Sequence, residues 1–176
     1  MNYSELKLFD VANGPGIRVT LYVSGCTHHC NGCFNTVTWD FNAGKPFDEA
    51  VMDKIIDAMK ASYIAGLTIL GGEPFEYVNQ EGLLPLLKKV KETYPEKDVW
   101  CFTGYLFDKD IIDAMAKESP YTSELLKYID VIVDGPFIEE QRNLMLKFKG
   151  SENQRTIDVQ KSLETGYVIE REGYES

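Results

Sequence analysis

Residues 18–34 read Arg18-Val-Thr-Leu-Tyr-Val-Ser-Gly-Cys-Thr-His-His-Cys-Asn-Gly-Cys-Phe34. The stretch begins with β-branched and aromatic residues, which predict a strand, and continues into a loop with the spacing C-x3-C-x2-C. Three thiols this close in sequence can reach one inorganic centre. Because each iron of a [4Fe–4S] cluster is usually held by one cysteine, Cys26, Cys30 and Cys33 would leave one iron open to bind a substrate.

The same loop holds the only two histidines of the chain, His28 and His29. A structural zinc ion bound by the three cysteines and one of these histidines is therefore the alternative. Zinc sites favour two separated ligand pairs, and no second pair is present, so the cluster is the preferred interpretation. Of the two histidines, His29 is the better candidate for a hydrogen bond to a cluster sulfide. Cys101 lies in an apolar stretch and is expected to be a small buried hydrophobe.

The bulk properties indicate one domain of 176 residues with a real core, since 44% of the residues are hydrophobic. A net charge of −10 argues against nucleic acid or an anionic membrane as the main partner. No apolar run is long enough to span a membrane, and residues 1–10 show no signal-peptide pattern. We therefore expect a cytoplasmic protein, in which cysteines serve as metal ligands rather than disulfides.

Beyond the cysteine loop, strand and helix patterns alternate. Helices are predicted over residues 47–62, with Asp48 as the N-cap, and over 82–93, with Pro85 in the first turn. The remaining predicted elements are strands over 67–70, 98–102 and 131–133, helices over 109–117 and 123–128, and a short strand over 167–169.

This alternation predicts an α/β fold with a mostly parallel sheet. Since parallel strands joined by right-handed crossovers point the same way, the loops after the strands share the carboxyl edge of the sheet, where ligands bind. Four or five such units are too few to close an eight-stranded barrel, so we expect an open partial (β/α) barrel. The loops are the cysteine segment, Gly71-Gly-Glu-Pro74, Thr103-Gly-Tyr105 and Asp134-Gly-Pro-Phe137.

Several of these motifs have two interpretations. In Gly71-Gly-Glu-Pro74 the glycines let the backbone approach a ligand and Glu73 offers an acceptor to an ammonium group, but an ordinary tight turn has the same composition. Thr103-Gly-Tyr105 is either a ligand contact or a strand terminus. Arg18 either enters a strand or faces a carboxylate or phosphate, and residues 150–155 form a surface turn or a lip that meets a partner.

The cysteine spacing followed by Gly-Gly-Glu-Pro resembles the radical S-adenosylmethionine (SAM) superfamily. Over residues 1–157 the chain is similar, more narrowly, to the activating proteins of anaerobic (class III) ribonucleoside-triphosphate reductases; residues 158–176 form a possible tail outside the resemblance. It departs from many superfamily members at Gly32, where they place an aromatic residue before the last cysteine; here Phe34 follows instead. The further motifs that carry the narrower resemblance are Asn13-Gly-Pro-Gly-Ile-Arg18, Thr38-Trp-Asp-Phe41, Gly44-Lys-Pro-Phe47, Val133-Asp-Gly-Pro-Phe137 and Gly150-Ser-Glu-Asn-Gln-Arg155.

The resemblance implies a single radical SAM domain and an oxidoreductase activity. Cys26, Cys30 and Cys33 would hold three irons, and SAM would chelate the fourth. A flavodoxin or ferredoxin-type protein would supply one electron, and cleavage of SAM would give a 5′-deoxyadenosyl radical. That radical would remove a hydrogen atom from a glycine of the partner reductase, and the glycyl radical would start ribonucleotide reduction there.

The resemblance also implies site residues and partners. Gly71, Gly72 and Glu73 would hold the methionine end of SAM, and the backbone of Gly32, Cys33 and Phe34 would lie against its adenine, with the reductase glycine entering the open side of the barrel. A homodimer is compatible with it. Activation of another glycyl-radical enzyme such as pyruvate formate-lyase, a small-molecule radical SAM reaction, and a non-catalytic iron–sulfur or zinc module remain the alternatives.

Overall fold

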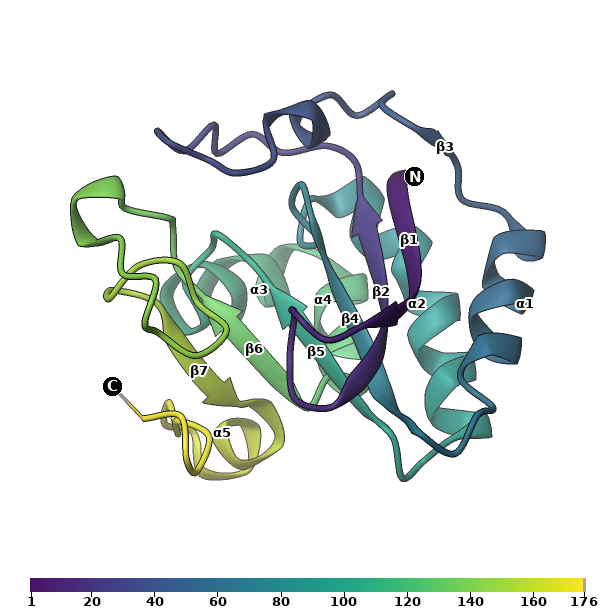
Figure 1. Ribbon diagram of the computed structural model, residues 1–176. Coiled ribbons are helices and arrows are strands. Elements are labelled where there is room, and N and C mark those ends of the chain that lie inside the picture. Colours follow the sequence, from purple (N-terminus) through teal and green to yellow (C-terminus); the bar gives the residue numbers. More distant parts are fainter. Residues whose placement is uncertain (176) are drawn as a thin grey trace.

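A computed structural model describes residues 1–175, in which one open seven-stranded sheet organises the chain (Figure 1). The strands are β1 (Asn2–Asp10), β2 (Ile17–Val23), β3 (Lys45–Pro46), β4 (Ile64–Gly71), β5 (Asp98–Phe102), β6 (Val131–Asp134) and β7 (Arg155–Asp158), in the order β3-β1-β2-β4-β5-β6-β7. The central four, β2, β4, β5 and β6, are parallel. The expected open α/β sheet is confirmed, and its edge strands β3 and β7 do not pair to close a barrel.

Helices connect the parallel strands and cover one face of the sheet, where Figure 1 shows α1, α2, α3 and α4. The helical segments are α1 (Glu49–Ala58), α2 (Tyr77–Thr93), α3 (Ala116–Glu118), α4 (Pro120–Leu126) and α5 (Val159–Thr165), with 3-10 turns η1 (Thr36–Trp39) and η3 (Glu139–Gln141) and the π-helical segment η2 (Phe107–Met115). Asp48 caps α1 as predicted, accepting a hydrogen bond from the Val51 amide at 3.0 Å. Within residues 1–175 no helix is long and apolar enough to cross a bilayer.

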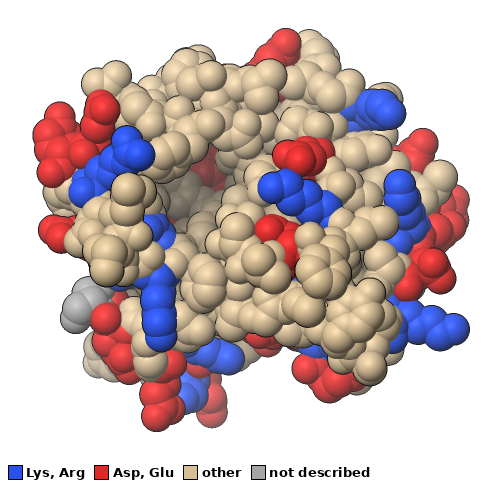
Figure 2. Space-filling view, viewed as in Figure 1, with Lys and Arg blue, Asp and Glu red and all other residues tan. Residues whose placement is uncertain are grey.

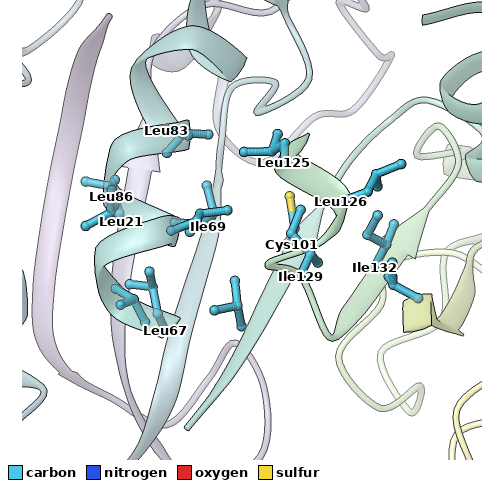
Figure 3. Close-up of a cluster of buried hydrophobic side chains, with 14 of the residues drawn as sticks. Leu21, Leu67, Ile69, Leu83, Leu86, Cys101, Leu125, Leu126, Ile129 and Ile132 are labelled. Carbon is cyan, nitrogen blue, oxygen red and sulfur yellow. The ribbon is translucent and has the colours of Figure 1, made fainter. Parts of the chain in front are cut away.

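The main core lies between the sheet and these helices (Figure 3). Leu83 and Leu86 of α2 face Leu21 and Ile69 of the central strands. Cys101 of β5 belongs to the same cluster, and burial raises the pKa of its thiol well above the ordinary value. The prediction that Cys101 is a small buried hydrophobe is therefore confirmed.

Ile69→Ala should lower the free energy of unfolding by about 2–5 kcal/mol, because it removes fully buried side-chain atoms and leaves a cavity in a central strand. Urea unfolding followed by far-UV circular dichroism measures the loss. Leu163→Ala on α5 is the control, since Leu163 is 40% exposed and should change stability much less. Equal losses in the two variants would contradict this assignment of the core.

The prediction for the second helix is wrong at its start. Helix α2 begins at Tyr77, so Pro85 lies well past the first turn, inside the helix. Tertiary hydrogen bonds hold the added turn: the Asn79 side-chain amide donates to the carbonyls of Ser24 (3.0 Å) and Glu73 (2.9 Å). Because the bond to Ser24 joins segments 55 residues apart, the apolar periodicity of residues 82–93 does not report it.

Three strands that are not predicted complete the sheet at its edges. Strand β1 pairs antiparallel with β2, and β7 pairs antiparallel with β6, so the sheet is parallel only in its centre. The predicted strand over residues 167–169 is instead a single bridge, Ile157↔Glu170. The sequences of β1, β3 and β7 are polar or irregular, and pairing with neighbouring strands rather than their own residue patterns makes them strands.

Arg18 lies at the start of β2, and Asp98 is the first residue of β5, so their salt bridge (2.7 Å) lies at the amino edge of the parallel strands. The fully buried guanidinium also donates to the Thr68 hydroxyl at 2.7 Å. Arg18 thus lies in a strand and faces a carboxylate, that of Asp98, so both interpretations given above hold, and its contacts join neighbouring strands.

Candidate iron–sulfur and ligand site

The three cysteines line a cavity of about 680 Å³ at the carboxyl edge of the parallel strands. Gly71, Gly72 and Glu73 line the same cavity, as does Phe34. Figure 1 shows the cysteine segment crossing the end of the sheet after β2, and Figure 2 shows the surface hollowed on this side. The volume is within the range of sites for small molecules and cofactors.

The thiols differ in exposure. Cys26 is buried, and burial raises the pKa of its thiol to about 11; Cys30 and Cys33 are partly exposed. No three His, Cys, Asp or Glu side chains within residues 1–175 are grouped as one metal ion would require. A four-iron cluster instead takes each thiolate at a different iron. The three cysteines that line the cavity could each hold one iron of such a cluster.

The paired glycines bring the β4–α2 loop against the cysteine segment. The amides of Gly72 and Glu73 donate to the carbonyls of Val23 (2.9 Å) and Gly25 (2.7 Å). A Cβ atom on Gly72 would lie 2.5 Å from the Gly25 carbonyl oxygen, too close for any side chain. These glycines therefore permit contact between two loops, and that contact orders the start of the cysteine segment.

The Glu73 carboxylate is buried and makes four hydrogen bonds within the protein. One oxygen lies 2.8 Å from His28 Nε2 and accepts from the Gly104 amide at 2.7 Å. The other accepts from the Phe75 amide at 2.8 Å and from the Thr103 hydroxyl at 2.7 Å. This side chain thus ties together the cysteine loop, the β4–α2 loop and the loop after β5.

His28 is therefore anchored on the protein side of the loop. Burial alone would lower the pKa of its imidazole, but the hydrogen bond to Glu73 and the charge of that carboxylate outweigh burial and raise the pKa. A Cβ atom on Gly104 would lie 2.8 Å from the imidazole, and the Tyr105 ring packs edge-on against it at 4.3 Å between centroids. Thr103-Gly-Tyr105 thus holds the Glu73–His28 pair.

Glu76 makes a second link of the same kind. Its carboxylate accepts from both the amide (3.0 Å) and the hydroxyl (2.7 Å) of Thr27. Burial, followed by the charge of Glu76, raises the pKa of the nearby Tyr105 to about 12. The sequence interpretation missed Glu76, although its place three residues after Glu73 was a signal that it belongs to the same loop.

His29 and the aromatic residues after the cysteine loop support the other side of that loop. The His29 imidazole stacks on the Trp39 ring, with centroids 4.3 Å apart and planes at 11°. The Phe41 ring lies under Gly25, where a Cβ atom would come within 2.2 Å of it. This aromatic segment thus packs beneath the cysteine loop.

Opposite the cysteine loop, the segment after β6 forms the other wall of the cavity. Phe137 lies against Phe34 with ring centroids 5.2 Å apart, and the Arg142 guanidinium lies 4.9 Å from the Phe34 ring. Leu146 and Lys149 of this segment also line the cavity. The site is therefore a cleft between the cysteine loop and residues 137–150.

The chain matches the family described as "4Fe-4S single cluster domain" over residues 12–157. It is 44% identical over 156 residues to the anaerobic ribonucleoside-triphosphate reductase-activating protein of Haemophilus influenzae, covering 88% of this chain and 96% of that protein. The proteins of the same name from Escherichia coli K12 (37% identical over 88% of this chain and 96% of that protein) and enterobacteria phage T4 (41% over 88% and 92%) are similar as well.

The chain belongs to the anaerobic ribonucleoside-triphosphate reductase-activating protein family. Residues 12–157, which match the cluster domain, include the cysteine loop, the Gly-Gly-Glu-Pro loop and the segment after β6. Helix α5 follows this range, and the chain beyond it returns to the sheet, where the Arg171 amide donates to the Thr156 carbonyl at 2.8 Å.

Proposed function

We propose that this chain is an activase that generates a glycyl radical on an anaerobic ribonucleoside-triphosphate reductase by radical SAM chemistry. The observation that carries the proposal is the convergence of three cysteines and the Gly-Gly-Glu-Pro loop on one cavity. The names of the similar proteins support the choice of reductase. They favour it over pyruvate formate-lyase, the alternative that the motifs alone leave open.

In this proposal Cys26, Cys30 and Cys33 hold a [4Fe–4S] cluster by three of its irons. When bound, the cluster supplies the electron that cleaves SAM into methionine and a 5′-deoxyadenosyl radical, with a flavodoxin or ferredoxin-type protein as the external reductant. The protein supplies binding, orientation and exclusion of water. The hydrogen bonds of Thr27 to Glu76 and of His28 to Glu73 anchor the part of the cysteine loop that directly follows Cys26.

The cavity has room for SAM beside the cysteines. We propose that the backbone of Gly71, Gly72 and Glu73 binds the methionine end, with carbonyl oxygens accepting from its ammonium group. Because the Glu73 carboxylate already has four partners, its role is to position His28 and the loop. The backbone of Gly32–Phe34 would lie against the adenine.

The open sheet corresponds, in this proposal, to the partial barrel of radical SAM proteins and forms a single domain, with residues 158–176 outside the part that resembles the superfamily. An unclosed sheet suits a protein substrate, because the glycine-bearing loop of the reductase must enter from the side. We further expect the protein to act in the cytoplasm, where its thiols stay reduced.

Anaerobic EPR tests the proposal. After reconstitution with iron and sulfide, the reduced protein should give a [4Fe–4S] signal that changes when SAM is added. Addition of the reductase should then produce a glycyl-radical signal and 5′-deoxyadenosine. A cluster whose spectrum ignores SAM, or SAM cleavage without a radical on the reductase, would contradict it. Pyruvate formate-lyase in place of the reductase is the matched control.

A further inference from the structure

The rim loop, residues 142–149, borders the cavity and displays two large apolar side chains to solvent. Leu146, Phe148 and Lys149 line the cavity, whereas Leu144 and Met145 are 82% and 90% exposed. No other large hydrophobic side chain in the described part of the chain is as exposed as these two. Isolated exposed apolar residues are common, but an adjacent pair in a loop that borders a cavity marks a candidate contact site.

The rim loop holds this pair in a defined conformation. Its ends are joined by an antiparallel bridge between Arg142 and Ser151 and by a hydrogen bond from the Asn143 amide to the Gly150 carbonyl at 3.3 Å. The Asn143 side chain accepts from the Met145 amide at 2.9 Å. A loop ordered before binding loses less conformational entropy when a partner binds.

The charge of the rim loop is opposite to that of the whole protein. Arg142, Lys147 and Lys149 supply three positive charges, and residues 142–149 contain no acidic side chain, although the chain carries a net charge of −10. Arg142 and Lys147 lie over the aromatic rings of Phe34 and Tyr174, and no ion pair within residues 1–175 involves any of the three cations. Figure 2 shows Lys and Arg side chains beside the hollow.

We infer that the rim loop is a docking element for the reductase. Leu144 and Met145 enter an apolar recess on the reductase, and carboxylates of the reductase surround that recess. This inference rests on the proposed function, because a partner whose residue must reach the cavity has to pass the rim. Interfaces commonly combine a few buried apolar anchors with a charged rim, and methionine adapts readily to the shape of a recess. The three cations would attract the surrounding carboxylates and speed association.

The test measures binding and chemistry separately for the double variant Leu144→Ser/Met145→Ser. We expect its dissociation constant for the anaerobic reductase of the same organism, measured anaerobically by biolayer interferometry, to rise by about tenfold or more. Reductant-driven SAM cleavage without reductase should stay within about twofold of the wild type, because neither side chain lines the cavity. Tyr167→Ser, at a 76% exposed position, is the control and should bind normally.

A second variant, Lys147→Glu, tests the charge. This variant should slow association with the reductase and weaken the dependence of the association rate on salt. Lys60→Glu is the control and should do neither, because Lys60 lies between α1 and β4, whereas the rim loop lies between β6 and β7. Unchanged reductase binding by the double variant and by Lys147→Glu would overturn the inference. So would a change from dimer to monomer in free Leu144→Ser/Met145→Ser, which would assign the rim loop to a second copy of this chain. If the wild-type protein does not cleave SAM, the result would instead contradict the proposed function.

Discussion

Cys30→Ala is expected to abolish cluster binding and all SAM cleavage, as are Cys26→Ala and Cys33→Ala. Each variant removes one of the three thiols that the proposal assigns to a cluster iron, and nothing else in the described cavity lining is a cysteine. Iron and sulfide analysis after anaerobic reconstitution should show that the iron content falls from about four irons per chain to a small fraction of that value. EPR of the reduced variants should lack the [4Fe–4S] signal.

Cys101→Ala is the matched control within the same chain. It also removes a thiol, but from the core between the sheet and the helices. We expect full iron content and SAM cleavage, with a moderate loss of stability from the lost side-chain volume. Normal iron content in any of the three cluster variants, or its loss in Cys101→Ala, would contradict the assignment.

Glu73→Ala is expected to lower the free energy of unfolding by about 3 kcal/mol or more. It leaves the Phe75 and Gly104 amides and the Thr103 hydroxyl without their buried acceptor, and each unsatisfied group costs about 1–3 kcal/mol. The cysteine loop should also lose the anchor at His28, so the reconstituted cluster should release iron faster. Urea unfolding and the rate of iron transfer to a chelator measure the two effects.

Glu73→Gln separates the hydrogen-bond pattern from side-chain volume. In one orientation its NH₂ group faces the Gly104 amide, and in the other it faces the Phe75 amide, so two donors oppose each other either way. We expect a loss of about 1–3 kcal/mol together with faster iron release. Glu124→Gln, which alters an exposed ion pair with Lys127, should change neither property appreciably. Wild-type behaviour of Glu73→Gln would show that the carboxylate does not position the loop.

Local sequence patterns predicted the centre of the fold well. Strands β2, β4, β5 and β6 and helix α1 follow from apolar runs, their periodicity and an N-cap, because these signals lie within each segment. The start of α2 was predicted five residues too late. Its first turn is held by Asn79, whose hydrogen-bond partner Ser24 lies 55 residues away in sequence.

The candidate site divides in the same way. The spacing of the three cysteines determined the donor set, and the strand–loop–helix order placed the cysteine loop and the Gly-Gly-Glu-Pro loop at one edge of the sheet. The roles of individual side chains could not be predicted from the sequence. Glu73 lines the cavity, and the sequence did not show that its carboxylate also contacts His28 and Thr103, which are 45 and 30 residues away.

By itself, then, the sequence determined which thiols are available, how closely they are spaced, and that an α/β sheet presents them at one edge. Only the tertiary structure decided that Arg18 pairs with Asp98 and that Glu73 and Glu76 hold the cysteine loop. It also decided that Leu144 and Met145 are exposed in a loop from which other residues line the cavity. The reason is physical. Strand and helix patterns arise from interactions between near neighbours, whereas buried hydrogen-bond partners and cavity walls come from segments that meet only after the chain has folded.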